Sequence, residues 1–463
     1  MPSRRDFFKL ALTALHAEYS SAAQANADRT ADPLAPRAPH FPPRAKSVIF
    51  LFMDGGVSHI DSFDPKPRVQ KESGESLPLS RPKHVRAVSP VLYGSPFEFA
   101  RYGQSGADVS SLFPEVAQCV DDLCIVRSMV ADHSEHTAAN YFMHSGSGLQ
   151  GRPSLGAWVT YGLGSVSRNL PGYIVLDTGM IPPGGLDIFG SGFLPASYQA
   201  SLFRRGQQPV ADIVPRETSP SVQRAKLDLL RDLDRVALSR YHNVTEMEAA
   251  VANYELAFRM QSAVPELADI SGESEATRKM YGLDEKDTEE FGRSCLLARR
   301  LVERGVRFIE LLSPARQGAD RWDQHAKLKY GHSVNAKATD KPIAALLRDL
   351  KARGMLRDTL VLWGGEFGRT PTAQGTGENI GRDHHPYGFS MWLAGAGVKP
   401  GLIYGATDEY GYYAIENRVH VHDLHATMLH LLGFDHTRLT YPFSGREMRL
   451  TDVHGTVVHS ILA

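Results

Sequence analysis

The sequence predicts an α/β fold in which helices cover both faces of a mostly parallel sheet. A continuous apolar run over residues 47–53 is typical of a strand that is buried on both sides. A strand, a helix and a strand follow one another between residues 307 and 363, which is the pattern of a β-α-β unit. Two of these strands end in a carboxylate beside glycines, Asp54 and Glu366, and ligand sites in such sheets lie beyond the carboxyl ends of the strands.

The composition is that of a globular protein with a large core. Of the 463 residues, 42% are hydrophobic and 22% are charged. The 51 Lys and Arg nearly balance the 52 Asp and Glu, so bulk charge would not hold a polyanion, and nucleic acid is not an expected partner. Cys119, Cys124 and Cys295 are odd in number and lack metal-type spacing, which predicts neither a zinc finger nor a complete disulfide framework. The 19 histidines are the compositional excess, and His is a common metal ligand.

The N-terminus predicts export. Residues 3–10 place two arginines before apolar residues, as a twin-arginine signal does, and residues 23–27 offer small-residue cleavage sites. We therefore expect a signal over residues 1–27, a Pro- and Ala-rich linker over residues 28–45, and a periplasmic or secreted protein. The alternative is a fortuitous basic start on a cytoplasmic protein. No later segment has the roughly 18 uninterrupted apolar residues that a membrane span needs, so no span is expected.

The folded domain is expected over residues 46–463. After the first strand, Gly- and Pro-rich sequence followed by charged, helix-favouring sequence predicts a partly helical insertion at about residues 165–305. Apolar runs and helical spacing then return. They predict a strand, a helix, a strand and a helix over residues 307–312, 343–350, 359–363 and 423–432.

Asp54 and Glu366 are candidate metal ligands because each follows a buried strand. Their neighbouring glycines allow the backbone to approach a ligand or a metal closely. A carboxylate in such a place is also a common helix N-cap, which is the alternative for either residue alone. Since the carboxyl ends of parallel strands share one edge, we interpret the two carboxylates together as part of a site.

Loops that carry histidine supply further candidates. Asp323 and His325 offer an oxygen and an imidazole from one short loop, a mixture that suits zinc, manganese or iron better than calcium. His384 and His385 lie in a dense polar loop, for which the alternative is an exposed turn. His136 and the small residues after it predict a helix N-terminus, whose free N–H groups favour an anion, with a polar surface turn as the alternative.

The order of these motifs resembles the alkaline phosphatase superfamily, and more closely the bacterial family called domain of unknown function 1501, often described as sulfatase-like. The matching stretches are residues 53–56, 58–65, 136–146, 322–325, 366–371 and 381–384. With the twin-arginine start, the resemblance covers nearly the whole chain except the insertion. It implies an α/β/α sandwich with two metal ions a few ångström apart and a nucleophile at a helix N-terminus.

The resemblance also implies which residues bind the metal. By position, Asp54 and Glu366 match the ligands of the ion beside the nucleophile, and Asp323, His325 and His384 match the ligands of the second ion. It implies one or two divalent ions, with zinc as the first choice and manganese, magnesium or calcium as alternatives. Two such ions would polarise a phosphoryl or sulfuryl oxygen.

This chain departs from the pattern at the nucleophile. An Asp-His pair is usual where the chain has Gly-Glu366, so one imidazole is missing from that metal site. The place of the nucleophile falls on His136, or on Thr137 after a one-residue gap. Thr137 would need the metal to lower its pKa, whereas His136 would serve as a ligand and leave a metal-activated water to attack. The resemblance further implies that Arg369 contacts a non-bridging oxygen of the substrate.

We therefore expect an exported, metal-dependent hydrolase of small-molecule phosphate or sulfate esters. It would use a two-metal site made of Asp54, His136, Asp323, His325, Glu366 and His384. The alternative is a catalytically inactive binding or structural module of the periplasm that keeps the fold and pairs with another exported protein. A metal-dependent mutase or transferase would share the same site. Convergence of these six candidate ligands within the roughly 4 Å that separates the ions of a two-metal site would favour the enzyme, and its absence would favour the binding module.

Overall fold

The computed structural model describes residues 33–463 except residues 81–88, 207, 216, 218, 242–244 and 320. The predicted export signal and the first residues of the predicted linker lie outside the described residues. The described part of that linker is held against the domain, because the backbone N–H of Arg37 donates to the carbonyl oxygen of Leu163 and those of Arg44 and Ala45 donate to Leu431. In the part of the chain that the structure describes, no helix combines the length and the apolar character needed to cross a bilayer.

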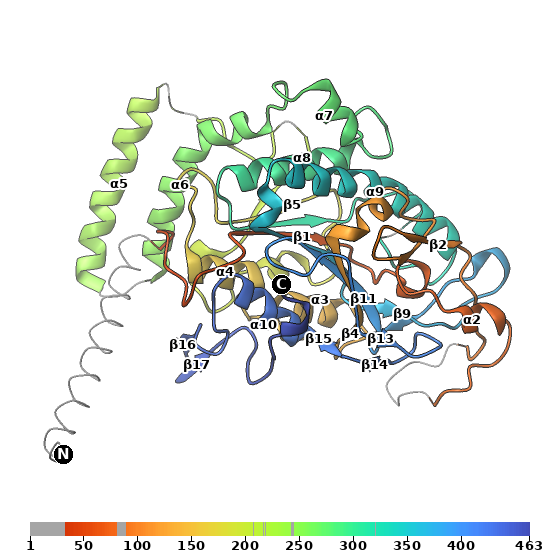
Figure 1. Cartoon of the computed structure of the whole chain (residues 1–463). Coiled ribbons are helices and arrows are strands. Elements are labelled where there is room, and N and C mark those ends of the chain that lie inside the picture. The colour runs from red at the N-terminus through yellow and green to blue at the C-terminus, as the bar shows by residue number, and fades with distance from the viewer. Residues whose placement is uncertain are drawn as a thin grey trace, which may run out of the picture.

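A nine-stranded sheet forms the centre of the domain (Figure 1). Its order is β12-β4-β11-β8-β1-β7-β5-β6, with β15 also paired to β4. The pairs of β11 with β4 and β8 are antiparallel and the other pairs of this sheet are parallel, which confirms the predicted mostly parallel sheet. The strands are β1 (Ser47–Phe52), β4 (Leu123–Val130), β5 (Tyr173–Leu176), β6 (Ser201–Phe203), β7 (Phe308–Leu312), β8 (Thr359–Gly364), β11 (Phe389–Ala394), β12 (Leu402–Tyr404) and β15 (Val419–His420).

Helices cover both faces of this sheet (Figure 1). The α-helices of the described residues are α2 (Pro67–Lys71), α3 (His136–Ser145), α4 (Leu155–Leu163), α5 (Pro220–Tyr241), α6 (Thr245–Ala268), α7 (Glu275–Met280), α8 (Glu289–Glu303), α9 (Leu328–Ala352) and α10 (Val421–Leu431), of which α8 and α9 lie on one face and α3, α4 and α10 on the other. Strand β1 shows the division, because its side chains alternate between two hydrophobic clusters. Ile49 and Leu51 pack in the cluster of α8 and α9, and Val48, Phe50 and Phe52 pack in the cluster of α3, α4 and α10. The fold is thus an α/β/α sandwich.

The strands and helices expected from apolar patterning are present. Strands β1, β7 and β8 cover the three predicted strands, and α9 and α10 cover the two predicted helices. Strands β7 and β8 are parallel to β1 but do not pair with each other, since β1 lies between them. Periodicity predicts an element but carries no information about its neighbours in the sheet.

The segment expected as an insertion contributes to the sheet as well as to the helical layer. Strands β5 and β6 extend the central sheet beyond β7, and α8 packs against α9. The helical part of the segment therefore lies over residues 220–303. Strands of four and three residues among Pro and Gly are too short for alternation to be visible in the sequence.

Short hairpins complete the described fold. Strands β9 (Gly368–Arg369) and β10 (His384–His385) pair just after β8. The other pairs are β2 (Phe99–Tyr102) with β3 (Ala107–Ser110), β13 (Ala406–Thr407) with β14 (Ala414–Glu416), and β16 (Tyr441–Phe443) with β17 (Arg446–Met448). Because β1, β4, β7 and β8 run in one direction, the loops after them and the β9–β10 hairpin gather at one edge of the sheet.

Candidate metal centre

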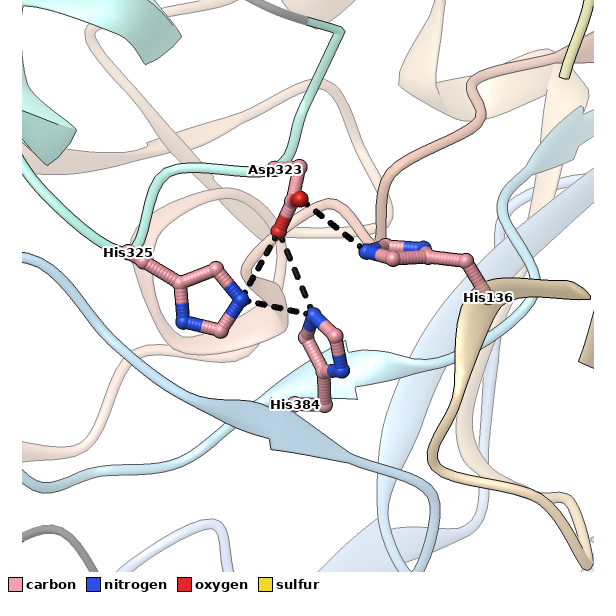
Figure 2. A group of neighbouring side chains, drawn as sticks. All are labelled: His136, Asp323, His325 and His384. Carbon is pink, nitrogen blue, oxygen red and sulfur yellow. Dashed lines mark hydrogen bonds and ion pairs between the residues drawn. The ribbon is translucent and has the colours of Figure 1, made fainter. Parts of the chain in front are cut away.

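Four side chains converge at this edge: His136, Asp323, His325 and His384 (Figure 2). One ligand atom from each lies within 4.8 Å of the others. Asp323 stands at the centre, with Oδ1 3.1 Å from Nε2 of His325 and 3.2 Å from Nε2 of His384, and with Oδ2 3.1 Å from Nε2 of His136. We call these residues the four-residue cluster.

Helix α3 fixes the position of His136. The helix begins at His136, as the small residues after it predict, and Glu135 is its N-cap. The carboxylate of Glu135 accepts the N–H groups of Thr137 and Ala138 at 3.0 and 3.1 Å. These N–H groups were expected to bind an anionic ligand, but they donate to the chain's own carboxylate because an acidic residue lies directly before the helix. The side chain of Thr137 is exposed.

The β9–β10 hairpin decides which of two neighbouring histidines joins the cluster. His384 pairs with Arg369 and His385 with Gly368. Consecutive side chains of a strand point to opposite sides, so only one of the two can face Asp323. His384 does so, whereas His385 is fully buried and its Nε2 donates to the carbonyl oxygen of Tyr412. The predicted ligand His385 is therefore not part of the four-residue cluster.

Each imidazole of the cluster is oriented by an oxygen acceptor at Nδ1. The distances are 2.6 Å from His136 Nδ1 to Glu366 Oε1, 2.5 Å from His325 Nδ1 to Gln374 Oε1, and 2.7 Å from His384 Nδ1 to the carbonyl oxygen of Ser134. A carbonyl or amide oxygen only accepts, so Nδ1 carries the proton and donates it. Nε2 of each ring is left to face the cluster, which is the usual orientation of histidines that bind a metal.

The donor set fits a divalent cation. Nε2 of His325 and Nε2 of His384 are 2.8 Å apart. With both Nδ1 atoms protonated, two nitrogen lone pairs face each other across this distance, an arrangement that a cation bound between them would stabilise. Three imidazoles and one carboxylate suit zinc in particular.

Electrostatics keep the central carboxylate ionised. Burial alone would raise the pKa of Asp323, but the protonated His136 beside Oδ2 and the charge of Arg369 hold that pKa far below its usual range. Burial lowers the pKa of His384, which favours the neutral imidazole. Burial would also lower the pKa of His136, but hydrogen bonds with Asp323 and Glu366 outweigh it and raise that pKa to about 9. A cation at Nε2 of His136 would displace the proton that these carboxylates otherwise hold there.

The predicted ligands Asp54 and Glu366 lie beside the four-residue cluster and are fully buried. Both oxygens of Glu366 lie within hydrogen-bond distance of the N–H of Gly55, at 3.0 and 3.1 Å. Asp54 Oδ2 is 2.8 Å from Nε of Arg321, close enough for an ion pair but not aligned for a hydrogen bond. Burial, opposed by the charge of Arg321, raises the pKa of Asp54 to about 8. The structure thus places both carboxylates next to the donor set. Glu366 contacts Nδ1 of His136, and the carbonyl oxygen of Asp54 accepts the N–H of Trp322, which precedes Asp323.

Arg369 supports Asp323 from within the protein. Its guanidinium is fully buried. Nη2 donates to Asp323 Oδ1 at 2.6 Å, Nε to the carbonyl oxygen of Gly56 at 2.9 Å, and Nη1 to that of Arg382 at 3.1 Å. The guanidinium thus faces protein oxygens, and the contact of Arg369 with a substrate oxygen stays a prediction.

Two residues of the site were missed by sequence reasoning. Gln374 orients His325, and Arg321 pairs with Asp54. Gln374 lies in a polar stretch with no spacing that marks it. Arg321 directly precedes the Trp-Asp-Gln-His motif, and that adjacency was the only available signal.

Comparison with known proteins gives one family match. A family model described as "Protein of unknown function (DUF1501)" matches residues 45–462, which include the whole four-residue cluster. No curated protein sequence matches this chain.

Several solved structures are similar to the chain. One is the PsFucS1 sulfatase from Pseudoalteromonas sp., with 12% identity and a TM-score of 0.35, over 90% of this chain and 71% of that chain. Another is the lipoteichoic acid synthase LtaP from Listeria monocytogenes, with 10% identity and a TM-score of 0.33, over 90% and 78% of the two chains. A third is the alkaline phosphatase from the Antarctic bacterium TAB5, with 12% identity and a TM-score of 0.28, over 78% and 94%.

Proposed function

The chain belongs to the DUF1501 protein family, and we propose that it is an exported, metal-dependent hydrolase of phosphate or sulfate esters. The observation that carries the proposal is the convergence of three imidazoles and one carboxylate at the carboxyl edge of the sheet. The side chains of the cluster are 14–34% exposed, so a small anionic ester can approach them from solvent. A bound divalent ion would supply Lewis-acid polarisation of an ester oxygen.

The residues around the cluster prepare it for an anionic substrate. Asp323 is kept ionised by His136 and Arg369, and Nη2 of Arg369 donates to its Oδ1 at 2.6 Å. Gln374 and the carbonyl of Ser134 keep Nδ1 of His325 and of His384 protonated. With neutral imidazoles, the cluster carries a single negative charge, that of the Asp323 carboxylate. The two positive charges of a bound divalent ion exceed it, so the metal-loaded site would be positive and would attract an anion.

We propose that water attacks the ester and that no covalent enzyme intermediate forms. His136 is held on both sides, at Nδ1 by Glu366 and at Nε2 by Asp323, so its ring serves as a donor of the cluster. The exposed side chain of Thr137 interacts with the N-cap carboxylate of Glu135. Both nitrogens of His136 are thus occupied, and Thr137 is not among the side chains that converge on the metal position, although its hydroxyl would need the metal to lower its pKa.

Turnover measurements on three ester classes test the proposal. Purified protein would be assayed with an aryl phosphate, an aryl phosphodiester and an aryl sulfate, with bound metal measured in parallel. We expect turnover of at least one class, its loss on chelation and its recovery with added zinc. Turnover of phosphate or sulfate esters would also identify which group the site accepts. Metal-loaded protein that turns over none of them would favour the inactive binding or structural module.

Export is tested separately, because the signal and the metal site are independent. A fusion of residues 1–27 to a reporter that is active only after export should be exported, and substitution of Arg4 and Arg5 by Lys should abolish this. A reporter that stays in the cytoplasm with the natural arginines would contradict export and leave the hydrolase proposal unaffected.

A further inference from the structure

We infer that the centre takes one divalent ion, at the four-residue cluster, and that Arg321 supplies the positive charge beside Asp54 where a second ion was expected. This inference rests on the proposed function, since it concerns the same site. It follows from the contacts of Glu366, of Asp54 and of the loop that carries Arg321.

Glu366 serves as the acceptor behind a ligand. Its Oε1 lies 2.6 Å from Nδ1 of His136, and both of its oxygens lie within hydrogen-bond distance of the N–H of Gly55. Its side chain is 0% exposed. A carboxylate that accepts the second N–H of a ligating imidazole orients that imidazole and raises its basicity. Glu366 therefore acts through His136 and not as a ligand of its own ion.

Asp54 is compensated by a guanidinium. Nε of Arg321 is 2.8 Å from Oδ2 of Asp54, and the Asp54 side chain is 0% exposed. A guanidinium keeps its charge at every physiological pH. A divalent ion bound to Asp54 would lie beside this fixed charge in a poorly hydrated place, where like charges repel strongly.

The backbone at Arg321 is built to hold this position. Arg321 has a φ of 47°, which a non-glycine residue adopts only when its surroundings compensate the strain. Its carbonyl oxygen accepts from Nε2 of Gln324 at 2.9 Å and from Nδ2 of Asn335, and both of these amides are buried. Its Nη2 donates to the carbonyl oxygen of Ile181 at 2.6 Å. Hydrogen bonds thus hold Arg321 both at its backbone carbonyl and at its guanidinium.

The same loop delivers Arg321 to Asp54 and Asp323 to the cluster. The N–H of Trp322 donates to the carbonyl oxygen of Asp54 at 3.0 Å. A Cβ on Gly55 would lie 2.7 Å from the backbone nitrogens of Trp322 and Asp323, so only glycine permits this approach. The contact of Trp322 with the Asp54 backbone therefore positions Arg321 beside the Asp54 carboxylate and Asp323 within the four-residue cluster.

Solvent access separates the two places in the same way. The side chains of His136, Asp323, His325 and His384 are 14%, 30%, 34% and 17% exposed, against 0% for Asp54 and Glu366. An ion that exchanges with solvent reaches the four-residue cluster, whereas the oxygens of Asp54 and Glu366 are covered.

Counting zinc per chain tests the inference. The full-length protein and the variants Asp54→Asn and Asp323→Asn would be dialysed against zinc and analysed by native mass spectrometry and elemental analysis. We expect one ion in the natural protein, one in Asp54→Asn and none in Asp323→Asn. Asp340→Asn is the matched control, because Asp340 is a buried carboxylate that accepts the N–H groups of Glu115 and Val116 away from the site.

Other numbers of zinc ions per chain would contradict either the inference or the proposed function. Two ions in the natural protein, or a single ion that Asp54→Asn removes, would overturn the inference and leave the metal-dependent hydrolase in place. No ion in the natural protein would overturn the metal centre of the proposed function itself.

A thermal coupling experiment keeps the role of Arg321 testable without activity. In metal-free protein at about pH 9, above the Asp54 pKa of about 8, Arg321→Met should lower Tm by leaving the Asp54 carboxylate without its counter-charge, and adding Asp54→Asn should recover part of the loss. Losses in Tm that simply add in the double variant would overturn the pairing of Arg321 with Asp54.

Discussion

Asp323 and Asp54 are two aspartates on adjoining stretches of backbone, and their surroundings drive them in opposite directions. Asp323 is partly exposed and contacts three histidines and Arg369, and its pKa is far below the usual range. Asp54 is fully buried beside one guanidinium, and its pKa is raised to about 8. A hydrogen bond from Trp322 to the Asp54 carbonyl joins the two places.

The difference shows that the number of hydrogen-bond donors, more than proximity to the site, makes a carboxylate a ready ligand. Donors around Asp323 stabilise its charged form and leave it facing an accessible cluster. Asp54 has lost water without gaining aligned donors, so its charged form is penalised. Position at the end of a strand is the same for many carboxylates, but only the tertiary surroundings decide their charge.

Gln374→Ala should lower the metal affinity of the four-residue cluster around Asp323, and this is the largest of the effects predicted here. Gln374 Oε1 accepts the proton of His325 Nδ1 at 2.5 Å and so fixes the ring that faces Asp323. Loss of such an outer acceptor lowers metal affinity by about 10–100-fold. Competition with a chromophoric zinc chelator measures the affinity. Gln118→Ala, which removes an exposed glutamine outside the four-residue cluster, is the control. Equal zinc affinities of the two variants would show that Gln374 does not orient His325.

Asp54→Asn should change how stability depends on pH. The folded-state pKa of Asp54 is raised from 3.8 to about 8, so the folded protein keeps a proton that the unfolded chain releases. The stabilising contribution of that proton is fully present below about pH 4 and is lost as pH rises through about 8. In metal-free protein, the free energy of unfolding should therefore fall over this range by up to about 1.4 kcal/mol per pH unit more than in Asp54→Asn.

Denaturant titrations between about pH 5 and pH 8 check this slope, in the range where a proton-linked change is expected. Parallel pH profiles of the natural protein and Asp54→Asn would mean that Asp54 is ionised in the folded state, like Asp323, and the contrast between the two would disappear.

His385→Gln should have the smallest effect on the ion. His385 neighbours His384 in sequence but donates to the carbonyl oxygen of Tyr412, away from Asp323. We expect an unchanged zinc content and a loss of about 1–2 kcal/mol in the free energy of unfolding, because a buried hydrogen bond is weakened. The matched variant His384→Gln should lose zinc. Zinc loss in His385→Gln would place that residue in the metal centre after all.

Much of the fold could be predicted from the sequence because its strands are buried on both faces. The apolar runs that became β1, β7 and β8 needed no partner to be recognised. Strands β5 and β6 escaped prediction because so few residues carry no periodicity. Within the site, the Asp-x-His motif and the glycine-flanked carboxylates were visible, whereas Gln374 and Arg321 became functional candidates only through contacts made by folding.

The sequence by itself determined the kinds of donor and their places after the strands, since residue type and strand burial are properties of the chain. Only the tertiary structure decided that His384 and not His385 faces Asp323, because the pairing of β9 with β10 sets which side each points to. It also decided that Asp54 meets a guanidinium, because the loop of Arg321 crosses the backbone at Gly55. Such choices depend on contacts between segments that are not neighbours in the sequence, Arg369 with His384 and Asp54 with Arg321, and no local pattern encodes them.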